Sequence, residues 1–147
     1  MPFGASVESA VLLLGDSSAG KSDVALRLIA MGARLLADDQ SALSVESGRL
    51  HAESVDAAHG HIEIRGIGIV KIPAARRVPV LFCVRLTQDA PPRLPEPEFF
   101  RPDGLRLSAA PRLFRLNGFE ASTPAKIAAA AAAMETDSLL PGDGSFF

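Results

Sequence analysis

The sequence of 147 residues predicts one α/β domain, residues 1–147, with a mixed, partly antiparallel sheet and a C-terminal Ala-rich helix. First, the apolar run Val11–Leu14 leads through a glycine-rich segment into a helical pattern, which indicates a strand, a loop and a helix. Second, residues 41–45 and 49–54 flank a glycine turn, which is typical of an antiparallel hairpin. Third, the alanine-dominated residues 125–135 have high helix propensity and predict the last helix.

Composition favours a soluble protein that acts through a local site. Hydrophobic residues make up 48% of the chain, and the formal net charge is −2. That charge gives no overall attraction to nucleic acid or to an acidic membrane, so we expect neither as a partner. The single cysteine, Cys83, lies in an apolar run and indicates a buried side chain in a reducing compartment. No apolar run reaches the roughly 18 residues of a membrane span, and a signal-peptide pattern is absent, so the sequence predicts a cytoplasmic location.

The segment after the first strand has the composition of a phosphate-binding P-loop. It comprises Gly15, Asp16, Ser17, Ser18, Ala19, Gly20, Lys21 and Ser22. Gly15 allows a sharp turn off the strand, and Gly20 allows the main chain to approach a phosphate closely. Lys21 supplies positive charge for the β and γ phosphates, and Ser22 offers a hydroxyl to Mg²⁺ at a helix N-terminus. The alternative is a Gly/Ser-rich surface turn that ends in Lys-Ser.

Two acidic residues follow the next predicted strand. The helical pattern over residues 23–31 is expected to end at Gly32, and residues 34–37 then predict a short buried strand. Asp38 and Asp39 end that strand, at the edge where α/β sheets bind their ligands. Phosphoryl transfer needs a metal ion and a group that positions the attacking hydroxyl. We therefore expect one carboxylate near the metal and the other near the hydroxyl, with a turn or helix cap as the alternative.

A second pair of charged residues lies in an isoleucine-rich segment, residues 59–73. Gly66 and Gly68 interrupt this segment and indicate a bend or a close backbone approach. Alternation in an extended chain would project Glu63 and Arg65 to the same face. The pattern favours Glu63 as a metal ligand and Arg65 as a phosphate-binding or structural partner. A simple salt bridge between them is the alternative.

Three histidines occur in the same half of the chain, His51, His59 and His61. Their spacing matches neither a helical nor a finger-like set of metal ligands. We therefore expect solvated or hydrogen-bonded histidines rather than a metal cluster.

The C-terminal half is predicted to contain a central strand and a long loop. Residues 78–86 are nearly all apolar, which is typical of a strand buried on both faces. Residues 89–103 contain five prolines and predict an irregular segment. Residues 105–107 and 112–116 are candidate short strands, and Thr123, which precedes a proline, is the expected N-cap of the last helix.

Three motifs in this order resemble HPr kinase/phosphorylase in its short form, the catalytic domain only. They span residues 15–23, 32–39 and 62–69, and the similarity is strong from about residue 11 to residue 72. The resemblance implies a P-loop kinase domain that uses ATP and Mg²⁺ to phosphorylate a serine of HPr, the carrier protein of the bacterial sugar phosphotransferase system. It also implies the reverse reaction, in which phosphate attacks phosphoserine and pyrophosphate is released. The family is hexameric, so a homo-oligomer is expected.

The resemblance also implies a role for individual residues. Lys21 and Ser22 correspond to the residues that hold the phosphates and Mg²⁺. Asp39 corresponds to the carboxylate that accepts the serine proton in one direction and returns it in the other, as microscopic reversibility requires. Glu63, in the Glu-x-Arg-Gly signature, corresponds to a metal ligand.

Later positions match more loosely, and one position departs from the family. Arg93 matches a family arginine, and residues 122–126 correspond to a basic segment used in dephosphorylation. The family has a catalytic histidine before the P-loop, whereas this sequence has none before His51; the corresponding position is near Phe3 and Gly4. Two alternatives therefore stay open, a nucleotide-binding regulatory module without catalysis and a P-loop kinase of a small metabolite.

Overall fold

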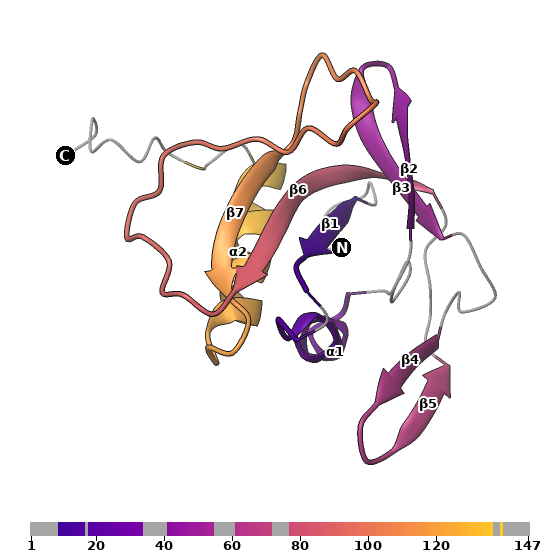
Figure 1. The fold of residues 1–147 in the computed structure, drawn as a ribbon, viewed down its shortest axis with the longest axis vertical. Helices are drawn as coiled ribbons and strands as arrows, with labels where there is room; N and C mark the ends of the chain where they lie inside the picture. The colour runs from indigo at the N-terminus through magenta and orange to yellow at the C-terminus, as the bar shows by residue number, and fades with distance from the viewer. Residues whose placement is uncertain are drawn as a thin grey trace.

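The computed structural model describes residues 9–16, 18–33, 41–54, 61–71, 77–136 and 139. In this part of the chain, a five-stranded mixed sheet, a separate two-stranded hairpin and two helices form an α/β fold (Figure 1). The five-stranded sheet contains β1 (Ala10–Leu14), β2 (Ser41–Glu46), β3 (Arg49–Ser54), β6 (Val78–Thr87) and β7 (Arg112–Asn117). The remaining elements are α1 (Lys21–Ala30), β4 (His61–Ile64), β5 (Gly68–Lys71) and α2 (Thr123–Glu135).

Strand β6 is the centre of the five-stranded sheet, as its apolar sequence predicts. It pairs in parallel with β1 and with β7, and its first two residues pair antiparallel with β3. Cys83 lies opposite Leu12 on one side and opposite Leu113 on the other. Because β1, β6 and β7 run in the same direction, the loops that follow them meet at one edge of the sheet.

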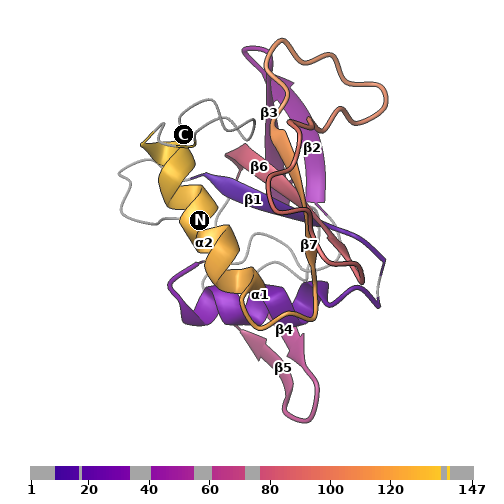
Figure 2. The same cartoon turned by 90° about the vertical axis from the view of Figure 1, so that its left-hand side faces the viewer.

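Both helices cover the same face of the sheet (Figure 2). Alternate residues of β6 point to this face, and the side chains of α1 and α2 complete a core with them. The buried members of the core are Ala19, Val24, Leu28, Phe82, Val84, Leu86, Ile127 and Ala131. Phe82 also contacts Phe114 edge-to-face, with ring centroids 5.4 Å apart. The many alanines of α2 fit this layer, since small side chains let a helix approach a sheet closely.

The thiol of Cys83 is fully buried, as its apolar neighbours predict. Burial raises the pKa of Cys83 from 9.0 to about 12, and the positive charge of Arg85 acts in the opposite direction. We expect the native thiol to resist a disulfide reagent at pH 8 and to react fully in denaturant.

Since the unfolded chain loses the proton of Cys83 at lower pH than the folded chain, the free energy of unfolding should fall above about pH 9. Urea titrations at pH 7 and pH 10 test this, and Cys83→Ala should remove that part of the pH dependence.

The predicted hairpin of β2 and β3 is confirmed, and its turn holds the long loop. Ser47 and Gly48 have φ angles of 52° and 76°, the left-handed pair of a two-residue hairpin turn. The carbonyl oxygen of Gly48 accepts hydrogen bonds from the backbone N–H groups of Ser108 and Ala109, at 3.0 and 3.2 Å. The prediction of a strand at residues 105–107 is wrong, because the backbone there runs as a loop to this anchor.

The predicted irregular segment at residues 89–103 is confirmed. Proline removes backbone donors, so this segment pairs with β7 only briefly, where the N–H of Leu113 donates to the carbonyl of Glu98 at 2.7 Å. The carboxylate of Glu98 also accepts two hydrogen bonds from Arg115, at 2.7 and 3.0 Å. These hydrogen bonds hold the pKa of Glu98 below its usual value.

The isoleucine-rich segment bends, as predicted. The bend comes from the backbone conformation of its glycines and not from close packing of neighbouring atoms. Strands β4 and β5 form a hairpin around residues 65–67, and Gly66 and Gly68 have φ angles of 90° and 126°. A Cβ atom at either glycine would meet nothing within 4 Å, so the backbone conformation requires glycine there. The prediction that Glu63 and Arg65 share one extended segment is wrong, because Glu63 lies in β4 and Arg65 lies in the turn.

Helix boundaries differ slightly from the prediction. Helix α1 begins at Lys21 and ends before Gly32, whose N–H donates to the carbonyl of Ile29 at 3.0 Å. The N-cap of α2 is Ser122 and not Thr123. Thr123 instead is buried, and its hydroxyl donates to the carbonyl of Asn117 at 2.5 Å.

No helix among the described residues has the length and apolar character needed to cross a membrane.

Candidate functional site

The glycine-rich loop between β1 and α1 is enclosed by the ends of the neighbouring strands. A Cβ atom at Gly15 would lie 2.9 Å from the carbonyl oxygen of Leu86, near the end of β6. A Cβ atom at Gly20 would lie 2.9 Å from the carbonyl oxygen of Gly118, after β7. Both glycines also have positive φ angles, 142° and 90°. The loop therefore needs glycine at these two positions for its own packing, in addition to any contact with a ligand.

The turn between β7 and α2 forms one wall of this loop. A Cβ atom at Gly118 would overlap the carbonyl oxygen of Ala19. The N–H of Gly118 donates to the carbonyl of Thr87 at 3.0 Å, which ties the turn to the end of β6. The sequence does not predict this contact, although Asn117-Gly118 after an apolar run is a recognisable turn signal.

Helix α1 presents its N-terminus at the same place. Its N-cap is Gly20, which has no side chain to satisfy the first N–H groups of the helix. The first intrahelical bond runs from the N–H of Val24 to the carbonyl of Gly20, at 3.0 Å. Lys21 and Ser22 occupy the first turn, half-buried and exposed respectively. A lysine and a hydroxyl at an uncapped N-terminus are suited to an anion with a bound cation.

The structure describes some, but not all, of the other residues predicted for the loop. Asp16 and Ser18 are exposed, and the carbonyl of Asp16 accepts the N–H of Ala19 at 2.9 Å. Ser17 lies outside the described residues. The predicted pair Asp38 and Asp39 and its strand at residues 34–37 also lie outside them, as do Phe3 and Gly4.

The structure places Glu63, Arg65 and Arg93 on exposed segments outside the glycine-rich loop. Glu63 and Arg65 are exposed on the β4–β5 hairpin, which projects away from the five-stranded sheet in both views (Figures 1 and 2). Arg93 is exposed in the long loop between β6 and β7. Within the described ranges, no group of three or more histidine, cysteine, aspartate or glutamate side chains gathers as a metal site.

The histidine prediction is tested only at His51. Its Nε2 atom lies 3.4 Å from a carboxylate oxygen of Glu46, and its Nδ1 atom lies 3.2 Å from the carbonyl oxygen of Arg49. The expectation of a hydrogen-bonded histidine is confirmed there. His59 and the side chain of His61 lie outside the described part of the chain.

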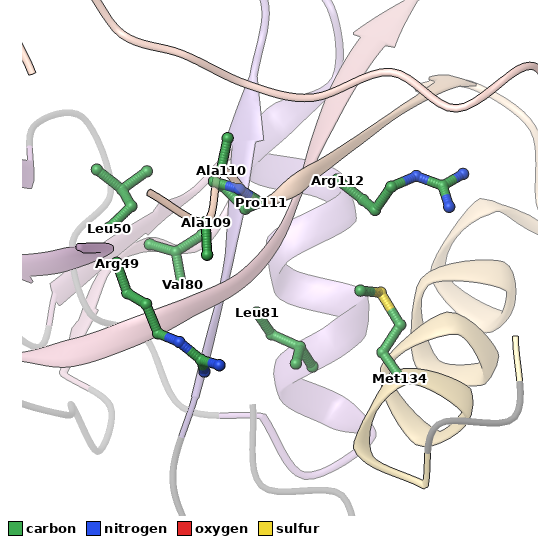
Figure 3. A pocket seen from close by; sticks show the side chains of 9 residues that line it. All are labelled: Arg49, Leu50, Val80, Leu81, Ala109, Ala110, Pro111, Arg112 and Met134. Carbon is green, nitrogen blue, oxygen red and sulfur yellow. The ribbon is translucent and has the colours of Figure 1, made fainter. Parts of the chain in front are cut away.

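A small hollow lies at the other edge of the sheet, where β7 begins (Figure 3). Its volume is about 180 Å³. It is lined by Arg49, Leu50, Val80, Leu81, Ala109, Ala110, Pro111, Arg112 and Met134. Arg112 stacks its guanidinium group on Phe114, 4.9 Å from the ring centroid. The hollow is separate from the glycine-rich loop, which follows the opposite ends of the parallel strands.

Known proteins are similar to this chain in sequence and in fold. Residues 6–76 match the family model described as HPr Serine kinase C-terminal domain. An HPr kinase/phosphorylase of Thermoanaerobacter sp. (strain X514) is 49% identical over 63 residues, 42% of this chain and 21% of the relative. One from Clostridium tetani is 41% identical over 64 residues, 44% of this chain and 21% of the relative. The chain thus matches about a fifth of the length of these curated relatives.

A solved structure extends the comparison to the fold. The structure of the Hpr(Ser) kinase/phosphatase from Coxiella burnetii superposes with a TM-score of 0.69. It is 23% identical, and the match covers 88% of this chain and 84% of that one. This likeness shows a common fold that includes the C-terminal half, where the family model does not match. Residues 6–76 of the chain are therefore similar in sequence to HPr serine kinase C-terminal domains.

Proposed function

We propose that this chain is the catalytic core of a protein serine kinase that transfers phosphate from ATP to an HPr-type carrier. The observation that carries the proposal is the family match over residues 6–76, which includes the glycine-rich loop and the uncapped start of α1. In the reverse direction, inorganic phosphate attacks phosphoserine, pyrophosphate leaves, and the serine is restored. The proposal includes a cytoplasmic location, a hexamer as in the family, and neither nucleic acid nor membrane as a partner.

The residues of the loop fit a nucleotide and Mg²⁺. Glycine at both ends lets the loop pack closely on the end of β6 and on the β7–α2 turn, and Gly20 places no capping side chain at the start of α1. Ser22 and Glu63 would hold Mg²⁺, which neutralises phosphate charge when it is bound. The ammonium group of Lys21 would bind the phosphate oxygens and stabilise the charge that develops during transfer.

Proton transfer is assigned to the paired carboxylates. Asp39 accepts the proton of the serine hydroxyl in the kinase direction and returns it to the serine oxygen in the phosphorylase direction. Asp38 would lie beside the metal. Arg65 and Arg93 would bind phosphate oxygens or nearby carboxylates. Arg65 and Arg93 are both exposed, and Glu63 and Arg65, on the β4–β5 hairpin, would have to approach the loop in the working complex.

The test is to supply an HPr-type protein with Mg²⁺ and ATP and to measure ADP release and phosphoserine together. Equal amounts of ADP and phosphoserine would support the proposal. Tight nucleotide binding without phosphoserine would favour the regulatory module instead, which the missing upstream histidine motivates. ADP release with a small metabolite, but not with the carrier, would favour the metabolite kinase.

The Asp39→Asn variant should lose both directions of transfer and keep its affinity for ATP. The amide cannot accept the serine proton, whereas nucleotide binding depends on the loop and on Lys21. The rates of phosphoserine formation and of pyrophosphate release measure the two directions, and calorimetry measures binding. Asp103→Asn, on the exposed long loop, is the matched control. Residual transfer close to the unmodified rate in Asp39→Asn would assign the base to another group.

A further inference from the structure

One exposed aromatic residue follows the glycine that packs on the glycine-rich loop. Phe119 is 62% exposed, and it follows Gly118, whose carbonyl oxygen packs against Gly20. The other large apolar side chains exposed among the described residues are Met31, Ile67, Ile69, Leu94, Phe99 and Leu139. Phe99 is the other aromatic of this set, and it bridges to Arg112 at the opposite end of β7. Of these two exposed phenylalanines, Phe119 is the one that follows the C-terminal end of a parallel strand.

The backbone that carries Phe119 is braced rather than loose. Its N–H donates to the side-chain oxygen of Asn117 at 2.8 Å, and the side-chain nitrogen of Asn117 donates to the carbonyl of Gln88 at 3.1 Å. The hydroxyl of Thr123 donates to the carbonyl of Asn117 from the start of α2. The turn is thus tied to β6 on one side and to α2 on the other. The backbone at Phe119 is therefore held in place, while its side chain is mostly exposed to water.

The topology determines where a nucleotide would extend from the loop. Lys21 and Ser22 begin the helix that follows β1, and they would hold the phosphates. Strand β6 pairs in parallel with both β1 and β7, so the three strands end at the same edge, and Thr87 lies opposite Asn117 in the last register pair of β6 and β7. Ligands of open α/β sheets extend across the loops at the C-terminal ends of adjacent strands. The surface next to the phosphates on this side is the β7–α2 turn, with Phe119 on it.

We propose that Phe119 stacks on the base of the bound nucleotide. This inference rests on the proposed function and names a residue that positions the nucleoside, which neither the sequence motifs nor the family match assigns. A phenyl ring offers an apolar face to any base and few directed polar contacts, so it would strengthen nucleotide binding with little base discrimination. ATP and GTP should accordingly bind with similar affinity, and both more tightly than inorganic tripolyphosphate.

The first experiment compares Mg²⁺-ATP and Mg²⁺-tripolyphosphate by calorimetry. In Phe119→Ala, we expect ATP to bind at least fivefold more weakly and tripolyphosphate to bind as before, because only ATP has a base. Phe99→Ala, which removes the exposed ring at the far end of β7, is the matched control and should change neither affinity. An equal loss of both ligands in Phe119→Ala would mean that the ring only supports the loop, and no loss of either would also overturn the inference.

A second variant gives a direct signal and does not depend on the stability of Phe119→Ala. The sequence has no tryptophan and no tyrosine, so Phe119→Trp introduces a single strong fluorophore. Stacking predicts that its emission is quenched by ATP and unchanged by tripolyphosphate, whereas Phe99→Trp should respond to neither. Binding of both ligands without quenching would refute the base contact and leave the phosphate site intact. Failure of the unmodified protein to bind either ligand would refute the phosphate site itself, and the inference with it.

Discussion

Lys21→Met is expected to lower the rate of phosphate transfer from ATP to the carrier by about a hundredfold or more. Lys21 is the first residue of α1 and follows Gly20, the N-cap residue, which has no side chain to cap the helix. Methionine keeps the length of the side chain and removes the charge that stabilises the phosphate oxygens as negative charge moves between them. Loss of one such group costs on the order of 10²–10³ in rate. Initial rates at saturating ATP measure the effect.

Lys71→Met is the matched control for this substitution. Lys71 ends β5 on the separate hairpin, and its side chain is exposed. The same change of charge at this position should leave transfer within about twofold, as is usual for an exposed side chain that does not take part in the reaction. Equal losses in the two variants would mean that overall charge, and not a specific contact of Lys21, determines the rate.

Gly118→Ala is expected to disturb the site although it changes no residue of the sequence motif. The new methyl group would overlap the carbonyl oxygen of Ala19, so the loop or the β7–α2 turn must shift. Overpacking of this kind costs about 1–3 kcal/mol of stability. We expect a lower Tm and at least a tenfold loss of affinity for ATP, because a displacement of the loop moves its N–H groups from the phosphates.

Gly104→Ala separates backbone strain from this steric effect. Gly104 has a φ angle of 80°, and a Cβ atom there would meet nothing within 4 Å. Its substitution should cost about 1 kcal/mol through the left-handed backbone and should leave ATP affinity unchanged. If Gly118→Ala bound ATP as tightly as Gly104→Ala does, the β7–α2 turn would not support the loop.

The local features of the fold were predictable because each is determined by neighbouring residues. Val11–Leu14 followed by glycine predicts β1 and its turn, and Ser47-Gly48 between alternating segments predicts the β2–β3 hairpin. The apolar run at β6 likewise predicts a central strand, which the two parallel partners confirm.

Features that depend on distant residues were not predictable. The packing of Gly20 on Gly118 joins positions 98 residues apart (118 − 20), and a single sequence does not reveal such contacts. The N-cap of α2 was misplaced because the Thr123 hydroxyl bonds to Asn117 across the turn rather than to its own helix. For the site, the β1–α1 junction was predictable from Gly15 and Lys21, whereas the exposed position of Phe119 on a braced turn requires the structure.

We propose that the β1–α1 loop holds the ATP whose γ-phosphate is transferred to the carrier. The most direct measurement is transfer of radiolabel from γ-labelled ATP to an HPr-type protein, with the unmodified chain and Lys21→Met in parallel. We predict label on a serine of the carrier with the unmodified chain and almost none with Lys21→Met. Absence of label on the carrier while ATP binds, or equal labelling by both proteins, would contradict the claim.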